Sequence, residues 1–509
     1  MKPKALVLVL AAMCALAGAA WAAAKSAPAA PAAKAEAAPR LSEASLACLE
    51  CHAAATPGIV ADWQKSRHAR TSPAQALAKP EANRRVSVKS PPADIKDFAV
   101  GCAECHARLS REHPDSFEHD AHRVHTVATP RDCAQCHPQE VDQYGRNLMS
   151  HAHGNLVNNP LYMDLAAQIN GVMTSDGGEV GQASPDAQTQ ADSCLACHGT
   201  EVRVVGSEPR ATDFGDMTFP RLSGWPNHGV GRKNPDGTIG SCAACHSRHQ
   251  FSIAMARSPY TCAECHKGPD VPAYKAYQVS KHGLIYFAMA KGWDMEAVPW
   301  TPGKDFTAPT CAACHVSALT DAEGNPIAAR THQMGDRIYQ RLLGLVYSAP
   351  HPKQPDTSLI KSPDGLNLPT ALDGRPASAF LIDAAEQARR KERLMKVCRA
   401  CHSQGWVEGH FALLDHAIAT SNAQTLAATR LMQHIWQKGL AQGPGQKASP
   451  FDEYIERLWV GEWLMHANAV RFAAAMMGPD LGVFDGGRWE STLNLRRMRD
   501  WLETRQQGK

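Results

Sequence analysis

The chain has 509 residues, 44% of them hydrophobic, which is enough for roughly three or four domains with buried cores. Its 53 Lys and Arg residues nearly balance its 50 Asp and Glu residues, and the formal charge of +3 gives no indication of a nucleic-acid-binding surface. The unusual feature is the content of 17 Cys and 24 His, which is far too high for an ordinary enzyme and indicates metal or cofactor chemistry.

Residues 1–22 have the pattern of a secretory signal peptide. Lys2 and Lys4 form a positive start, residues 5–20 are apolar, and Ala20-Trp21-Ala22 offers small residues at a cleavage site. The apolar run is shorter than the roughly 20 residues that a membrane-spanning helix needs. We therefore expect export and a periplasmic mature protein. Residues 23–40 are rich in Ala, Pro and Lys, have almost no large apolar side chains, and are expected to form a disordered linker.

Every cysteine after Cys14 lies in a Cys-x-x-Cys-His motif. This spacing is typical of c-type haem attachment, in which two thiols form thioethers to one porphyrin and the His binds the iron. Zinc sites need no His directly after the second Cys, and disulfides need no such spacing. The sequence therefore predicts eight covalently bound haems c. Their thiols are Cys48, Cys51, Cys102, Cys105, Cys133, Cys136, Cys194, Cys197, Cys242, Cys245, Cys262, Cys265, Cys311, Cys314, Cys398 and Cys401, and their first iron ligands are His52, His106, His137, His198, His246, His266, His315 and His402.

With so many haems, the macrocycles must provide much of the apolar core. We expect a mainly α multihaem cytochrome c fold with little sheet. A multihaem domain with seven motifs is expected over residues 41–375, and a helical C-terminal region with the eighth motif over residues 376–509. Turn-forming residues separate the motifs at 90–92, 234–237 and 362–365.

The C-terminal region has the clearest helical pattern. Ser449 and Pro450 are typical of a helix start, apolar residues then recur at three-and-four spacing through Trp459 and Trp463, and Gly478 is expected to end this helix. Further helices are expected near residues 379–400, 411–439 and 488–505. The two tryptophans fit either the core of one chain or a subunit interface.

A haem that only transfers electrons favours a second axial His, whereas a catalytic haem must leave one face of its iron open. Any of the remaining histidines could instead be a packing residue, and the sequence does not identify the open iron. The candidates for second ligands are His68, His119, His122, His125, His151, His153, His249, His282, His332, His351 and His410.

The chain resembles the octahaem hydroxylamine oxidoreductases over almost all of its mature length. The likeness lies in strings between the haem motifs, at residues 56–63, 66–68, 129–133, 153–156, 225–231, 281–283, 303–311 and 331–333. It implies a homotrimer with seven bis-His haems and one open catalytic haem on the fourth motif, which is Cys194, Cys197 and His198 here. Among the second ligands we favour His68, His125, His153, His249, His282 and His332.

Two departures distinguish this chain from the oxidative members of that family. Those enzymes cross-link the catalytic porphyrin to a C-terminal tyrosine of a neighbouring subunit, but the last tyrosine here is Tyr454. They also carry an Asp-His pair after the sixth motif, where this chain reads Asp270-Val271. The resemblance thus indicates the tyrosine-lacking branch, associated with reduction of nitrite and hydroxylamine to ammonia. The nitrite reductases that use Cys-x-x-Cys-Lys do not fit, since all eight motifs end in His.

Reduction at N–O bonds consumes protons, so a titratable group should lie beside the substrate. Asp270 is the first candidate and His228 the second; the former could instead be a turn carboxylate, and the latter a haem ligand or propionate contact. The electrons should come from a partner cytochrome or a quinol-oxidising membrane cytochrome. Hydroxylamine oxidation, electron transfer without catalysis, and reduction of a sulfur oxyanion are the alternatives.

Overall fold

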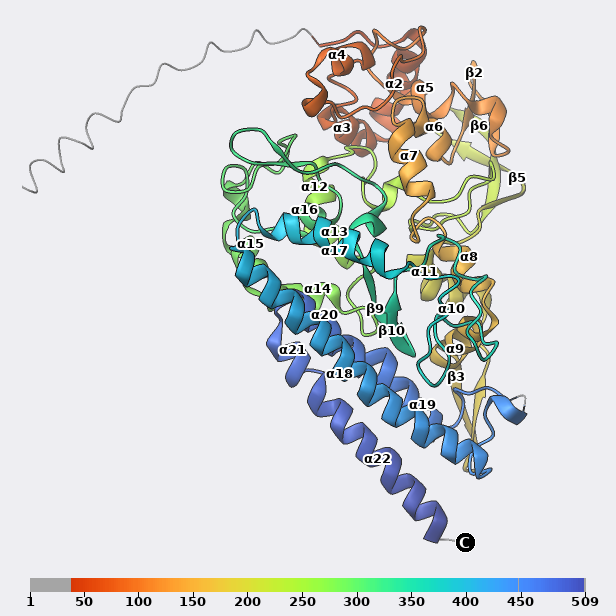
Figure 1. Ribbon diagram of the computed structural model, residues 1–509. Coiled ribbons are helices and arrows are strands. Elements are labelled where there is room, and N and C mark those ends of the chain that lie inside the picture. The colour runs from red at the N-terminus through yellow and green to blue at the C-terminus, as the bar shows by residue number, and fades with distance from the viewer. Residues whose placement is uncertain (1–37, 447, 508–509) are drawn as a thin grey trace, which may run out of the picture. The chain divides into compact units, whose positions relative to one another are not determined.

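The computed structural model describes residues 38–446 and 448–507, so the expected signal peptide and nearly all of the expected linker lie outside the described residues. From Pro39 onward the chain forms one compact unit (Figure 1). The expected division near residue 375 stays a prediction. Within the described residues, no helix is both long and apolar enough to cross a membrane.

The protein is mainly helical, with 47% helix and 12% strand, which confirms the predicted fold class. The described strands form two-stranded antiparallel hairpins only. These are β1 (Ser116–His119) with β2 (His122–His125), β3 (Val172–Asp176) with β4 (Glu179–Ala183), β5 (Arg203–Thr212) with β6 (Gly215–Ser223), β7 (Leu319–Thr320) with β8 (Pro326–Ala328), and β9 (Gln340–Leu345) with β10 (Tyr347–Pro350).

The part that carries the first seven motifs consists of short helices. Several begin at a proline behind a capping Ser, Thr or Asn, because proline is already set for the first helical turn and the cap accepts from a free amide. The helices are α2 (Glu43–Ala55), α3 (Pro57–Lys65), α4 (Pro73–Ala78), α5 (Cys102–His106), α6 (Pro130–Ala134), α7 (Pro138–Gly145), α8 (Ala152–Val157), α9 (Pro160–Asn170), α10 (Ala187–Asp192), α11 (Cys194–His198), α12 (Ile253–Arg257), α13 (Pro259–Ala263), α14 (Ala273–Gln278), α15 (Lys281–Met289) and α16 (Cys311–His315). Single 3-10 turns are η1 (Glu81–Asn83), η2 (Ser110–Glu112), η3 (Cys242–Ala244), η4 (Ala290–Gly292), η5 (Met334–Arg337) and η6 (Pro444–Gln446).

Longer helices follow, in the blue part of Figure 1, and the expected ones are all present with shifted ends. The helix expected at 379–400 begins later, since Asp383 caps its first turn. The helix expected at 411–439 begins earlier, at Gln404, because the side chain of Ser403 caps it by accepting from Trp406 N. The segments are α17 (Ala384–Cys398), α18 (Gln404–Gln437), α19 (Tyr454–Val460), the π-helical turn Gly461–His466, α20 (Ala467–Met476), α21 (Pro479–Val483) and α22 (Arg488–Gln507).

The expected helix start at Ser449 is wrong. Its hydroxyl donates to Asp164 Oδ2 at 2.8 Å instead of capping a helix. The helix begins at Tyr454, where Glu453 N donates to Glu456 Oε2 at 3.1 Å in a local capping arrangement. A side-chain contact with α9 therefore outweighs the local Ser-Pro signal.

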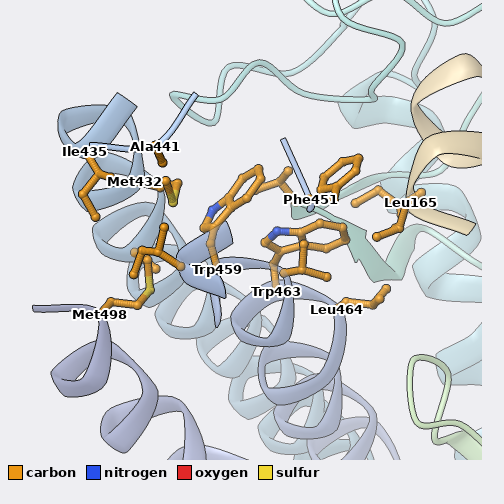
Figure 2. Close-up of a cluster of buried hydrophobic side chains, with 14 of the residues drawn as sticks. Leu165, Met432, Ile435, Ala441, Phe451, Trp459, Trp463, Leu464 and Met498 are labelled. Atoms are coloured by element: carbon orange, nitrogen blue, oxygen red, sulfur yellow. The ribbon is translucent and has the colours of Figure 1, made fainter. Parts of the chain in front are cut away.

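Trp459 and Trp463 belong to the largest side-chain core, drawn in Figure 2. Each is 2% exposed, and Trp459 Nε1 donates to Thr429 Oγ1 at 2.9 Å. Phe451 lies beside them, with its ring 6.3 Å from that of Trp459. The interpretation of these tryptophans as a subunit interface is therefore wrong, and they pack within one chain. In contrast, Tyr454 is 64% exposed.

Candidate haem and active sites

Each motif is held in one tight helical turn. The motifs at residues 102, 194 and 311 coincide with α5, α11 and α16. In others, the amide of the His donates to the carbonyl of the first Cys, as from His266 N to Cys262 O at 2.8 Å. One turn brings residues four apart to the same face, which allows both thiols and the imidazole to meet one macrocycle.

None of the sixteen motif cysteines forms a disulfide with another described residue. Thiols of different motifs nevertheless lie close enough to alter each other's titration, and the neighbouring Cys102 lowers the pKa of Cys48 to about 7. These neighbouring thiols show which motifs are adjacent in space. The first motif lies beside the second, the third beside the fifth, and the sixth beside both the fourth and the seventh. The thiol pairs are Cys48 with Cys102, Cys133 with Cys242, Cys197 with Cys265, and Cys262 with Cys311.

Several motif histidines face a second imidazole from a distant part of the chain. Two imidazoles that bind one metal at about 2 Å each have ring centres about 6 Å apart. The matching pairs, with their centroid distances, are His52 with His119 at 6.0 Å, His68 with His137 at 6.4 Å, His246 with His332 at 6.4 Å, and His282 with His402 at 6.0 Å. This spacing leaves room for a haem iron between the rings, so the residues present fit the predicted cofactor.

The rings of these pairs include strongly buried ones. Burial lowers the pKa of His68, His246 and His332 to about 4. They are therefore neutral near pH 7 and offer the nitrogen lone pair that an iron ligand needs.

His125 lies differently, although its ring centre is 5.7 Å from that of His106. The contact is on the Nδ1 side, because His106 Nδ1 donates to the carbonyl oxygen of His125 at 2.9 Å. An iron bound to His106 would lie on the Nε2 side. His249 is also near His106, since its charge adds to the burial that lowers the pKa of His106 to about 4, and it is the better candidate for the second motif.

The fourth motif is joined to the segment around His153. His198 Nδ1 donates to Ala152 O at 3.0 Å, and His153 Nδ1 donates to Gly199 O at 2.7 Å. Two ligands of one iron must face each other through their Nε2 atoms, so His153 does not suit the iron of His198. Among the described residues, no other imidazole ring pairs with His198, His266 or His315.

A glycine-rich segment packs directly on the fourth motif. Gly199 has φ +92°, and a Cβ added to it would lie 2.3 Å from the backbone amide nitrogen of Arg232. Gly231 approaches His198 O and His153 N equally closely, at 2.6 Å from its would-be Cβ. Val230 N donates to Cys197 O at 3.0 Å. The glycines of this string are therefore needed for backbone approach to the fourth motif.

Both candidate proton donors lie near this motif. Asp270 is exposed. Its carboxylate lies close enough to Cys197, His198 and His266 for its negative charge to act towards a higher pKa at each of them. The pKa of His198 is lowered by burial, with Asp270 acting in the opposite direction. His228 is exposed and is contacted by Arg248 Nη2 at 3.1 Å from Nδ1.

The remaining candidate histidines have local partners. His151 Nε2 donates to Gly145 O at 2.9 Å, which occupies the nitrogen that most axial ligands use. His351 Nδ1 donates to Pro352 O at 2.9 Å and leaves Nε2 free. His410 stacks on Trp406, which in turn stacks on His402 at 3.9 Å. His122 pairs with His119 in the β1–β2 hairpin.

Two groups of residues were not predicted from the sequence. Arg232 and Arg248 both lie over the ring of Trp225, at 5.3 and 5.2 Å, and neither forms an ion pair with a carboxylate of the described residues. His113 lies buried beside His125 and two aspartates. The two arginines could have been sought through the Trp-Pro-Asn-His string at residues 225–228, which contains the tryptophan that they contact. No sequence pattern distinguished His113 from other histidines.

Comparison with known proteins agrees with this geometry. A solved structure described as a hypothetical multiheme protein is 39% identical, with a TM-score of 0.87, and the match covers 92% of this chain and 97% of that one. The chain belongs to the multihaem c-type cytochromes. Residues 231–327 of this cytochrome match the family described as seven times multi-haem cytochrome CxxCH, and residues 47–127 match cytochrome c554 and c-prime.

Two further relatives come from Kuenenia stuttgartiensis. A probable nitrite reductase-hydroxylamine oxidoreductase fusion protein is 25% identical to this cytochrome in an alignment of 431 positions that covers 79% of this chain and 39% of that protein. The cytochrome thus spans about two fifths of that relative's length. A structure from a reducing HAO-like protein complex shares the fold, with a TM-score of 0.57, 18% identity and coverage of 92% of this chain and 87% of that one. The cytochrome carries covalently bound haem c and has a redox role.

Proposed function

We propose that this cytochrome is an exported octahaem enzyme that reduces nitrite, hydroxylamine or both to ammonia at the haem of the fourth motif. The observation that carries the proposal is the environment of His198, which, like His266 and His315, faces no second imidazole among the described residues, and which lies near the carboxylate of Asp270 and against the glycines of residues 229–231. The names of the Kuenenia relatives support nitrogen oxyanions and hydroxylamine as the substrate class.

The chain's own residues supply positioning, charge and protons for this reaction. Reduction of nitrite to ammonium takes up six electrons and eight protons and releases two waters. A haem bound at His198 would supply an iron for the substrate nitrogen and the path for electrons. Asp270, at the solvent edge of the fourth and sixth motifs, can pass protons to the departing oxygens. Arg232 and Arg248 place positive charge near His228, which attracts an anion such as nitrite.

The other motifs form the electron relay in this proposal. The neighbouring thiols of Cys197 and Cys265 place the sixth motif beside the fourth, and Cys262 and Cys311 connect it to the seventh. Axial imidazoles on both faces hold an iron in one geometry in both oxidation states, which suits electron transfer. A periplasmic redox partner, export by residues 1–22 and a homotrimer belong to the same proposal and rest on the signal-like segment and the family resemblance.

Hydroxylamine oxidation is the second candidate, favoured by the name of the fusion relative. It needs a porphyrin modified to accept electrons, and the chain has no tyrosine beyond Tyr454 for the family's cross-link. A non-catalytic relay is the third, with every iron bound on both faces.

The decisive experiment uses the purified holoprotein with a reduced viologen donor. Ammonia should form from nitrite and from hydroxylamine, and sulfite should be consumed much more slowly. Carbon monoxide should bind the reduced protein at one haem per chain. Absence of both turnover and carbon monoxide binding would leave the electron relay as the function, and a long-wavelength ferrous band of a cross-linked haem would favour oxidation.

A further inference from the structure

Asp270 lies on a short segment, residues 267–272, that joins the sixth motif to α14. The amide of Tyr274 donates back to His266 O at 2.8 Å, which closes the segment into a tight loop. Two prolines in the segment have no amide hydrogen to donate. The conformation of such a loop depends mainly on its contacts with other parts of the chain.

One side chain from a distant helix holds this segment. Asn468 Nδ2, on α20, donates to Asp270 O at 3.0 Å, across 198 positions of the chain. Among the described residues, this is the one hydrogen bond that residues 268–271 make. A single polar contact therefore attaches the backbone of the proposed proton donor to the C-terminal helices.

Asn468 is itself fixed by a full set of hydrogen bonds. Its Nδ2 also donates to Leu464 O at 2.7 Å, and its Oδ1 accepts from Gly344 N at 2.9 Å and from Arg471 Nη1 at 3.0 Å. An asparagine amide has two donor hydrogens and two acceptor lone pairs, so every site is used. Because two of the neighbours only donate and the two carbonyls only accept, the amide can take one orientation only. The exposed fraction of Asn468 is 0%.

Arg471 connects this amide to two further elements. It donates to Ser421 Oγ at 2.9 Å and to Asn422 Oδ1 at 2.8 Å on α18, and to Leu342 O at 3.3 Å on β9. The arginine side chain is fully buried. Buried polar networks whose members find partners are rigid, so Asn468 provides a fixed point for the segment that it holds.

Apolar packing holds the next part of the chain against the same helix. Ala276 of α14 is fully buried in one cluster with Ala469 and Ala473 of α20, and the two helices lie side by side (Figure 1). Helix α20 thus supports α14 through apolar contacts and the preceding loop through Asn468. It begins directly after the π-helical turn Gly461–His466, and such turns occur frequently at functional sites.

We propose that Asn468 is a positioning residue for proton delivery, which acts by holding the backbone of Asp270. This role rests on the proposed function, in which Asp270 gives a proton to an oxygen that leaves the substrate and regains one from solvent. The transfer requires the carboxylate to lie within hydrogen-bond reach of the reacting atom. A displacement of about 1 Å can lower a rate by about 100-fold. Because the carboxylate is exposed, loss of the bond from Asn468 would allow it to move away from the fourth motif.

A role in stability alone is the alternative, since a buried hydrogen bond also contributes to folding. The two roles differ in how they depend on Asp270. A residue that acts by positioning Asp270 changes turnover only while that carboxylate is present, whereas a general loss of structure lowers turnover in either case. A double-mutant cycle separates them.

The test combines Asn468→Asp with Asp270→Asn in the holoprotein, with kcat and KM for nitrite and hydroxylamine measured with a reduced viologen donor. The new carboxylate keeps the shape of the amide and accepts from Gly344 N and Arg471 Nη1, but it does not donate to Asp270 O. We expect Asn468→Asp to lower kcat by about tenfold, with KM and the haem spectrum unchanged. In the double variant, kcat should be no lower than in Asp270→Asn. Ser421→Ala, which removes a bond of the same buried network on α18, should keep the wild-type kcat.

Two results would overturn the role of Asn468 and leave the proposed function in place. The first is wild-type kcat in Asn468→Asp while Asp270→Asn loses turnover. The second is a loss in the double variant equal to the product of the two single losses, which would indicate an effect independent of Asp270. Full turnover in Asp270→Asn, or no turnover in the wild type, would contradict the proposed function and this role together. If Asn468→Asp does not accumulate, Asn468→Ser takes its place in the cycle, because its side chain is uncharged and too short to reach Asp270 O.

Discussion

His153 and His198 are tied to each other's backbone, His198 Nδ1 through Ala152 O and His153 Nδ1 through Gly199 O. Each ring is thereby held as the tautomer with a free Nε2, and the two rings are not placed to bind one iron from opposite faces. The same interaction removes the most obvious candidate for a second ligand at the fourth motif. An open face on that iron would therefore result from these hydrogen bonds to the backbone, which turn His153 away, and not from a lack of histidines in the region.

Removing one half of a facing imidazole pair should open a haem. In His282→Ala, His402 loses the imidazole whose ring centre lies 6.0 Å from its own, so an iron bound by His402 would lack a second imidazole. We expect one additional carbon monoxide per chain to bind the reduced protein and one haem to become high-spin, measured by difference spectra. His416→Ala should behave as the wild type. Unchanged carbon monoxide binding in His282→Ala would show that His402 is paired with another ligand.

Asp270→Asn should lower turnover of nitrite and hydroxylamine by about 100-fold, since a positioned proton donor contributes about that much. The absorption spectrum of the haems should stay the same, because the side chain is exposed and lies beside the motifs without belonging to them. Asp213→Asn, at the tip of the β5–β6 hairpin, is the matched control. Full activity of Asp270→Asn would exclude this carboxylate as the proton donor.

Arg248→Gln should weaken nitrite binding more than hydroxylamine binding. The guanidinium has no carboxylate partner among the described residues and contacts His228, so its charge is free to attract an anion. Loss of one charge within about 10 Å of the substrate is worth about 1–2 kcal/mol at an effective dielectric constant of about 20, or about tenfold in KM for nitrite. Hydroxylamine is neutral near pH 7, and its KM should change little. Arg210→Gln, whose side chain pairs with Glu208, is the control, and equal changes for both substrates would contradict a charge effect.

Glu462 should make stability fall as pH rises. Burial raises its pKa to about 7 from an ordinary value of 4.5, with hydrogen bonds from Ser491 and Asn494 acting against this. The folded state therefore binds more protons than the unfolded state between about pH 4.5 and 7, so the free energy of unfolding is highest below that window and declines through it. The decline is at most about 3 kcal/mol.

Chemical unfolding followed at pH 5 and pH 8 measures this dependence. Relative to the wild type, Glu462→Gln should gain stability at pH 8 and not at pH 5, because the amide does not ionise. Glu503→Gln, exposed on α22, should leave the pH dependence unchanged. A wild type and a Glu462→Gln variant with parallel pH profiles would show that this carboxyl is already solvated.

Much of this protein could be predicted from local sequence. The Cys-x-x-Cys-His spacing needs only one helical turn to work, and the mainly α fold and the late helices follow from composition and periodicity. Local signals failed where a distant residue competed for the same atoms. Ser449 looked like a helix cap but donates to Asp164, and the Trp459–Trp463 stripe is covered by α18 and α22 of the same chain.

The sequence alone predicted haem attachment at the Cys-x-x-Cys-His motifs, because attachment chemistry depends on side chains a few residues apart. Only the tertiary structure decided which histidines face each other, as in His52 with His119, and that His113 meets His125 and Asp132 in a buried cluster. Those relationships join segments whose separation along the chain carries no periodic signal. Their geometry is set by packing of the whole unit, which no local pattern encodes.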